Sequence, residues 1–278
     1  MLRILSHGGG VQTTVAALMH ARGELPPIDA AIFADTKEEP RAVYRQLAWV
    51  EQEVARSKYP FLIHRVSRGN LWAAASTVRT TRDGQRKYIA TSMPLYFRGA
   101  DGSEGIGRRQ CTEEFKIRPI IAKARELLDR RRKHIPASDG VLVEMLMGFT
   151  VDEIYRVKQS PIPWISKRHE LIDAGLSRAD CYAWAERRGY PELVGSACKF
   201  CPNRTDRGAL EPDELAETIE RELILQDGYA QTAIRKVPYL SEARIPLSQL
   251  RHSAERRRKM AEQQMNLFIN DCSGGCGV

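Results

Sequence analysis

The chain has 278 residues, with 43 lysines and arginines against 35 aspartates and glutamates, and a formal net charge of +8. Its 42% hydrophobic and 28% charged residues exclude a disordered chain and predict a globular protein with a sizeable core. No apolar run reaches the ~18–20 residues of a membrane span, and no secretory signal pattern opens the sequence. We therefore expect a cytoplasmic protein without a membrane partner, and the positive charge favours polyanionic partners such as nucleotides or nucleic acid.

Strand-like and helix-like segments alternate through the first half of the chain. Short apolar runs predict strands over residues 2–6, 30–35, 61–66 and 140–149. The intervening segments predict helices over residues 13–22, 40–56 and 115–134. Pro119 fits the last of these only near its first turn. The alternation predicts an α/β fold with a doubly wound, mainly parallel sheet.

The second half is less regular. Helices are expected over residues 177–190, 212–226 and 248–266, with Ser177 as the N-cap of the first. We expect a nucleotide-binding α/β domain over residues 1–160 and an irregular helical C-terminal extension over residues 161–278. Basic residues gather at 129–134 and 255–260, where they indicate either solvated helix faces or nucleic-acid contacts.

Three consecutive glycines, Gly8, Gly9 and Gly10, connect the first expected strand to the first expected helix. Such a turn presents backbone N–H groups and a helix N-terminus to an anion, and glycine lets a ligand approach the backbone. Ligands of open α/β sheets bind at the carboxyl ends of strands, where this turn lies. It is not a Walker loop, and Thr13 replaces the third glycine of a GxGxxG fingerprint. The pattern favours a phosphate- or sulfate-binding loop; a turn without a ligand is the alternative.

The loop GGGVQTT, residues 8–14, resembles the SGGxDS loop of the ATP pyrophosphatases and the phosphoadenosine phosphosulfate (PAPS) reductases. The segments FADTKEEP, RRQCTEEFKIRPI and GFTVDEIYR resemble later blocks of PAPS-reductase-like proteins, including phage-borne members and CysH-like proteins of CRISPR loci. The motif SACKFCP and the closing CSGGCGV fit the same members, so the resemblance covers most of the chain. It implies the adenine-nucleotide alpha-hydrolase-like fold, with ATP or another adenine nucleotide at the loop.

In this alignment Gln12 stands at the acidic position of the loop and Thr13 at its serine position. The residues expected to contact the nucleotide are Ser6, His7, Gly8, Gly9, Gly10, Val11, Gln12, Thr13, Thr14, Asp35, Thr36, Arg109, Lys116 and Arg156. Asp35 follows the second strand, where a ribose or Mg²⁺ contact is common in nucleotide folds. The basic side chains suit phosphate or sulfate oxygens. His7 is either an acid–base group or a hydrogen-bonded structural residue.

The cysteine spacing indicates metal or redox chemistry, because disulfides are disfavoured in the cytosol. CKFCP places Cys198 and Cys201 on one tight turn, from which both sulfurs can reach a metal, and the following proline recurs in iron–sulfur segments. Cys111 is the expected third ligand of a [4Fe–4S] cluster, and Cys276, or else Cys272, the expected fourth. A cluster held by three cysteines would leave one iron open to sulfide or substrate. A structural zinc and uncoordinated thiols are the alternatives. Cys181, inside an amphipathic helix, is expected to pack in the core.

The resemblance implies nucleotide-dependent sulfur chemistry in one of two forms. In the first, ATP with Mg²⁺, near Asp35, adenylates an acceptor, and sulfide then replaces AMP. In the second, a thiolate of the tail, Cys272 or Cys276, attacks the sulfonate of a bound sulfonucleotide, and a thioredoxin-like protein is a candidate partner. The rival hypothesis is a non-catalytic accessory protein that binds nucleotide or nucleic acid and holds a structural metal. A homo-oligomer is compatible with either.

Overall fold

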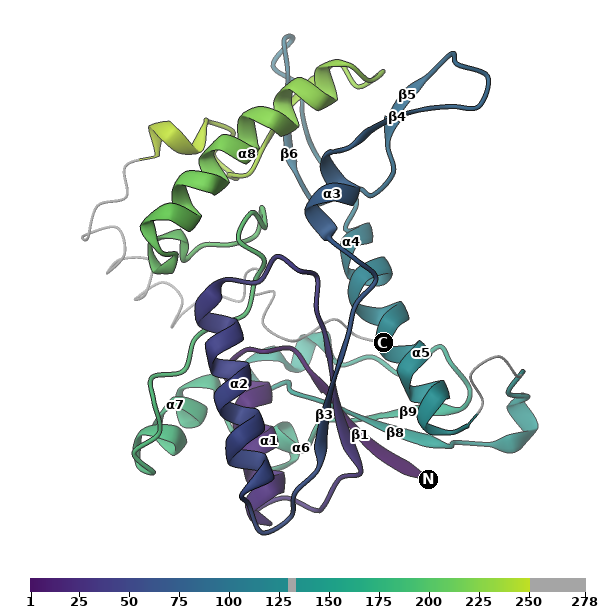
Figure 1. Cartoon of the computed structure of the whole chain (residues 1–278), viewed down its shortest axis with the longest axis vertical. Helices are drawn as coiled ribbons and strands as arrows, with labels where there is room; N and C mark the ends of the chain where they lie inside the picture. Colours follow the sequence, from purple (N-terminus) through teal and green to yellow (C-terminus); the bar gives the residue numbers. More distant parts are fainter. Residues whose placement is uncertain (130–133, 251–278) are drawn as a thin grey trace.

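The computed structural model describes residues 1–129 and 134–250 (Figure 1). Within them the central sheet has five parallel strands in the order β3-β2-β1-β8-β9. These strands are β1 (Leu2–His7), β2 (Ala30–Ala34), β3 (Leu62–Val66), β8 (Val143–Met147) and β9 (Ile165–Arg168). The four predicted strands are confirmed, and so is the α/β class. From β1 the strand order runs outward through β2 and β3 on one side and through β8 and β9 on the other.

Helices cover both faces of the sheet, which is why β2, with the sequence AAIFA, is buried along its whole length. On one face lie α1 (Val11–Arg22), α2 (Arg41–Ala55) and α7 (Arg178–Glu186). On the other lies α5 (Arg118–Leu127). Alternation along β1 divides the core, because Leu5 packs against the first group and Ile4 against α5. Cys181 of α7 is fully buried in the first core, as predicted.

A second group of elements lies beyond the carboxyl edge of the sheet, in the upper part of Figure 1. It contains α3 (Leu71–Ser76), the hairpin of β4 (Val78–Thr80) and β5 (Lys87–Ile89), and the long helix α8 (Pro212–Ala230). An antiparallel sheet joins β6 (Tyr96–Gly99) to β7 (Glu104–Ile106) and β10 (Lys236–Tyr239). Of these elements, α3, β5, β6 and α8 contribute to a third hydrophobic core, which includes Cys198.

Several predicted boundaries differ from the structure. The boundary expected at residue 160 falls between β8 and β9, so the sheet continues into the part expected to be an irregular extension. The helix expected over residues 115–134 begins as the π-helical turn Glu113–Ile117, continues as α5 with Pro119 in its first turn, and ends at Leu127. Asp129, with a φ of +56°, turns the chain there.

The remaining elements are short. They are α4 (Gln110–Thr112), α6 (Glu170–Asp173) and the 3₁₀ turns Ala137–Asp139, Val151–Arg156, Arg207–Ala209 and Leu247–Gln249. Most of the basic runs, most of the helix expected over residues 248–266, and both Cys272 and Cys276 lie outside the described residues. Within the described ranges, none of the helices is both long and apolar enough to cross a membrane.

Candidate functional site

The glycine turn lies at the carboxyl edge of the sheet, as its sequence position predicts. Because parallel strands end at one edge, the segments that follow β1, β2 and β8 meet there. Gly9 has a φ of +79°, which favours glycine, and a Cβ on it would lie 3.0 Å from the Phe33 ring and 3.1 Å from Val43 Cγ1. Glycine at position 9 is therefore required by both the backbone conformation and the lack of space.

Helix α1 begins directly after this turn, with Gly10 as its N-cap. No side chain caps the helix, and its first turn carries no acidic residue. Thr13 braces the turn instead, since its hydroxyl accepts from Gly8 N–H and donates to the Gly10 carbonyl, both at 3.2 Å. The side chains of Val11 and Thr14 are fully buried, so they face the interior rather than a ligand. The turn thus keeps the geometry of an anion-binding helix N-terminus.

His7 adds a buried donor beside the turn. Its Nδ1 accepts from Gly9 N–H at 3.1 Å, which leaves the proton of the neutral ring on Nε2. Burial lowers the pKa of His7 to about 4, so the ring is uncharged at neutral pH. Nε2 is buried and has no hydrogen-bond partner within the described chain. Such an atom is rare in native proteins and is satisfied when a ligand oxygen accepts from it.

Gln46 of α2 fastens the turn to a distant loop and was not singled out from the sequence. Its Nε2 donates to the Gly9 carbonyl at 2.8 Å and to the Val194 carbonyl at 3.1 Å. Its Oε1 accepts from Val194 N–H at 2.7 Å. The sequence does contain a signal for Gln46. It lies three residues after Val43 and four before Val50, so it is a polar residue on the buried face of the helix.

The segment after β8 packs directly on the first turn of α1. A Cβ on Gly148 would lie 2.4 Å from Thr13 Cγ2 and 3.2 Å from the Thr13 backbone nitrogen. Sequence reasoning did not identify this contact.

We expect Gly148→Ala to cost about 1–3 kcal/mol of stability, because the added methyl would overlap the Thr13 side chain and crowd its backbone. Chemical denaturation measures the loss. Gly105→Ala is the matched control, since a Cβ there meets only the Lys236 ammonium at 4.0 Å. Equal losses in the two variants would contradict the close approach.

The loop after β8 places the carboxylate of Glu153 against the side-chain amide of Gln12 in the glycine turn. Gln12, 2% exposed, donates from Nε2 to Glu153 Oε2 at 3.2 Å. Glu153, 8% exposed, pairs through its other oxygen with Arg156. Burial raises the pKa of Glu153 despite Arg156. Arg156, whose guanidinium lies 4.8 Å from the Phe149 ring centroid, was predicted at this site. Glu153 follows the same strand in the sequence, but it was not among the predicted nucleotide contacts.

Asp35 lies at the end of β2 as predicted, but its carboxylate is already bound within the protein. Oδ1 accepts from Tyr44 O–H and from Lys37 N–H, each at 2.7 Å, and Oδ2 pairs with the Lys37 ammonium at 2.8 Å. Burial alone would raise the pKa of Asp35, but the bonds from Lys37 and Tyr44 outweigh it and lower the pKa. The residue therefore stays ionised in this arrangement.

The predicted cysteine site lies beside this edge, against the third hydrophobic core. Cys198 belongs to that core, and Cys111 and Cys201 pack against it. Cys198 Sγ lies 3.3 Å from the Thr36 hydroxyl and 4.0 Å from Glu39 Oε1. Burial raises the pKa of the Cys198 thiol, and the nearby Glu39 carboxylate and Cys111 raise it further. Cys198 is therefore a protonated thiol unless a cation or metal binds there.

Glu39 connects the cysteine site with the glycine turn. It is almost fully buried, pairs with Lys116 at 3.4 Å and accepts from the Ser196 hydroxyl at 3.3 Å. That hydroxyl lies 3.6 Å from where a Cβ of Gly9 would stand. Thr36 and Lys116, predicted as nucleotide contacts, thus lie at the cysteine site, and Glu39 and Ser196 are additions from the structure.

Two buried arginines surround the cysteine turn. Arg204 donates to the carbonyls of Ala197 at 2.6 Å and Cys198 at 3.4 Å. Arg207, 5% exposed, donates from Nη2 to the Cys201 carbonyl at 3.0 Å. Burial lowers the pKa of Arg207 to about 10, and its buried Nη1 has no hydrogen-bond partner among the described residues. Arg204 also pairs with Asp206 at 2.8 Å, so the two guanidiniums together bring less than two net positive charges to the cysteine turn.

Among the described residues, no three His, Cys, Asp or Glu side chains form an arrangement suited to one metal ion. A four-iron cluster binds its thiolates at separate corners, so its ligands need not converge on one point. Cys111, Cys198 and Cys201, which share one hydrophobic core, are compatible with such a cluster. Of the other predicted residues, Ser6 is buried in β1, and Arg109 is exposed at the start of α4.

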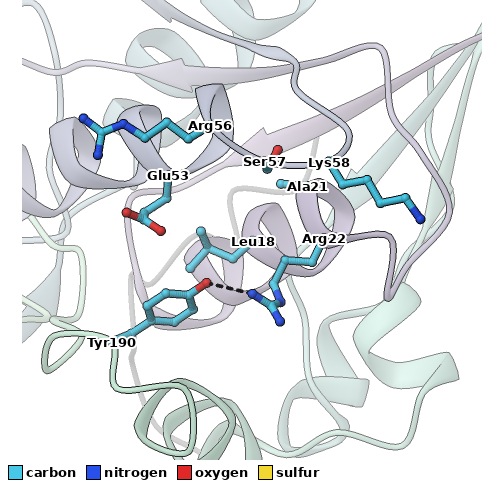
Figure 2. Close-up of a pocket in the computed structure, with 8 residues that line it drawn as sticks. All are labelled: Leu18, Ala21, Arg22, Glu53, Arg56, Ser57, Lys58 and Tyr190. Atoms are coloured by element: carbon cyan, nitrogen blue, oxygen red, sulfur yellow. Dashed lines mark hydrogen bonds between the residues drawn. The ribbon is translucent and has the colours of Figure 1, made fainter.

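A separate hollow of about 330 Å³ lies between the carboxyl-terminal ends of α1 and α2, far along both helices from the glycine turn (Figure 2). Tyr190 and Arg22, which are hydrogen-bonded at 3.4 Å, line one side of it. Figure 2 shows that Arg56 and Lys58 extend away from one another rather than into the hollow. Its charges therefore do not converge on a common ligand.

Comparisons with known proteins found no relative of this chain. The chain matches no protein-family model, no curated protein and no solved structure. Any function must therefore be argued from the geometry of the carboxyl edge and the cysteine site.

Proposed function

We propose that the protein binds an adenine nucleotide at the glycine turn and carries out sulfur chemistry at the adjoining cysteine site. The proposal includes the finer fold, a doubly wound sheet of the adenine-nucleotide alpha-hydrolase type. One observation carries it: Ser196 and Glu39 join the turn at Gly9 to the Cys198 thiol. A nucleotide on the turn would therefore have its phosphate or sulfate end beside the cysteines.

The residues of the turn have separate tasks in this proposal. The amides that open α1 bind the anionic end of the nucleotide, and His7 Nε2–H donates to one of its oxygens. Arg156 neutralises part of its charge, since a guanidinium carries five N–H donors and can hold Glu153 and a ligand together. Gln46 keeps the turn in place through the Gly9 carbonyl.

Cys111, Cys198 and Cys201 would hold the [4Fe–4S] cluster, with Cys276, outside the described residues, as the proposed fourth ligand. When bound by four cysteines, the cluster would supply electrons; held by three, it would also offer an open iron for sulfur. Arg204 and Arg207 would offset its negative charge from the backbone side. A structural zinc on the same cysteines is the competing assignment.

We expect Cys198→Ser to lose most of the iron and acid-labile sulfide that the wild-type protein holds after anaerobic purification. The reason is that Cys198 is the most buried of the three proposed ligands, and a serine hydroxyl is a poor substitute for a thiolate. Metal analysis measures the result. Cys181→Ala, which removes a buried cysteine from a different core, should keep its iron. Colourless wild-type protein containing zinc would overturn the cluster.

Turnover assays distinguish the two reactions. Labelled ATP should yield pyrophosphate if the protein is a sulfurtransferase, and PAPS should yield sulfite if it is a sulfonucleotide reductase. A second candidate, a binding protein without catalysis, is favoured by the amide at position 12. It would be supported if neither substrate reacts while ATP raises the melting temperature.

A further inference from the structure

Four buried carboxylates lie at or beside the carboxyl edge of the sheet, and each is paired with a cation of the protein. The pairs are Asp35 with Lys37 at 2.8 Å, Glu38 with Arg221 at 2.5 Å, Glu39 with Lys116 at 3.4 Å, and Glu153 with Arg156. Their remaining oxygens also accept hydrogen bonds, for example from Tyr44, Asn70, Ser196 and Gln12. The negative charge at this edge is thus neutralised within the fold.

The residue at position 12 determines whether this edge could bind a divalent cation. A carboxylate there would lie against Glu153, and two adjacent carboxylates would favour a divalent cation between them. The protein instead has an amide, whose Nε2 donates to Glu153 Oε2 at 3.2 Å. An amide nitrogen has two N–H donors, and Glu153 accepts from one of them. Gln12 and Arg156 therefore donate N–H groups to Glu153, His7 carries a further N–H, and none of the three supplies a carboxylate to a metal.

We propose that the nucleotide site binds its anion without a divalent cation, and that Glu153 is the positioning residue that orients Gln12 and Arg156 for this. The inference rests on the proposed function, because it concerns the charge of the nucleotide at the same turn. A Mg²⁺ ion bound directly to Glu153 would have to displace Arg156, and one bound directly to Asp35 would have to displace Lys37. Removing the partner of a buried charge is strongly unfavourable. Of the two proposed reactions, this favours the reduction of a sulfonucleotide by a tail thiolate, which does not call for Mg²⁺, over the transfer of sulfur with ATP and Mg²⁺.

The test is titration of ATP into the full chain by calorimetry, once with Mg²⁺ and once with EDTA. For the wild-type protein we expect dissociation constants that agree within about threefold. Glu153→Gln should weaken binding about tenfold in both buffers, because Arg156 loses the carboxylate that holds it. Asp152→Asn is the matched control: Asp152 is exposed, and its carboxylate accepts from Arg178 N–H rather than facing Gln12. It should bind as the wild type does.

The Mg²⁺ dependence of ATP binding by Gln12→Asp is a second readout, which would not change if Glu153 had only a structural role. The substitution places a second acid beside Glu153, so binding should weaken at least tenfold in EDTA and recover when Mg²⁺ is added. Melting temperatures establish that each variant is folded. Two results would overturn this inference and leave the proposed function standing. One is a wild-type protein that binds ATP only with Mg²⁺; the other is a Gln12→Asp variant whose affinity for ATP is the same with and without Mg²⁺. A wild-type protein that binds ATP in neither buffer would overturn both.

Discussion

Replacing Gln46 with leucine should lower the free energy of unfolding by about 3 kcal/mol and abolish ligand binding at the glycine turn. The side chain is 8% exposed and serves three backbone groups: the Gly9 carbonyl, and the carbonyl and N–H of Val194. Leucine fills a similar volume but bonds to none of them. Each buried group left without a partner costs about 1–3 kcal/mol, which exceeds the gain from the added apolar surface.

Urea denaturation measures the first effect, and nucleotide titration measures the second. Gln52→Leu is the matched control, because Gln52 is an exposed glutamine on the same helix and should change stability by less than about 0.5 kcal/mol. If both variants unfold at the same urea concentration as the wild type, the attachment of the turn to Val194 contributes nothing to the fold.

Acidification from about pH 6.5 to about pH 4 should remove about 3 kcal/mol of stability through His7 alone. Burial lowers the pKa of this imidazole from 6.5 to about 4, and the difference corresponds to about 3 kcal/mol. Between these pH values the unfolded chain binds a proton that the folded protein does not. Stability therefore rises with pH across this window and falls as the pH is lowered through it.

The measurement is the unfolding free energy at intervals between pH 7 and pH 4. Other histidines, such as His64 and His169, also have pKa values lowered by burial and add to the slope. His7→Asn isolates the contribution of His7, because the asparagine oxygen still accepts from Gly9 N–H but does not titrate. Its profile should be flatter than that of the wild type by about 3 kcal/mol. Parallel profiles would show that the pKa of His7 is the same in the folded and unfolded protein.

Much of the fold could be predicted from local sequence. The run AAIFA of β2 is buried along its whole length and has no polar position, and β1 and β8 are buried over most of their length. The helices α2 and α5 each bury one face, so their sequences have clear periodicity. Ser177 was identified as a helix N-cap because its capping bond to Asp180 is local. The strands of three or four residues, β4 to β7, β9 and β10, were missed, since so few residues carry no reliable alternation.

The position of the glycine turn was likewise determined by the sequence alone, because a strand, three glycines and a helix are local features. What the turn contacts was decided only by the tertiary structure. Gln46 meets Val194, Gln12 meets Glu153, and Thr36 meets Cys198 across 148, 141 and 162 positions of the chain. No local propensity encodes such pairs, since they arise when the parallel sheet brings its loops to one edge. In the sequence, Gln12 leaves the turn without an acidic residue. In the folded protein, its amide lies against the buried carboxylate of Glu153.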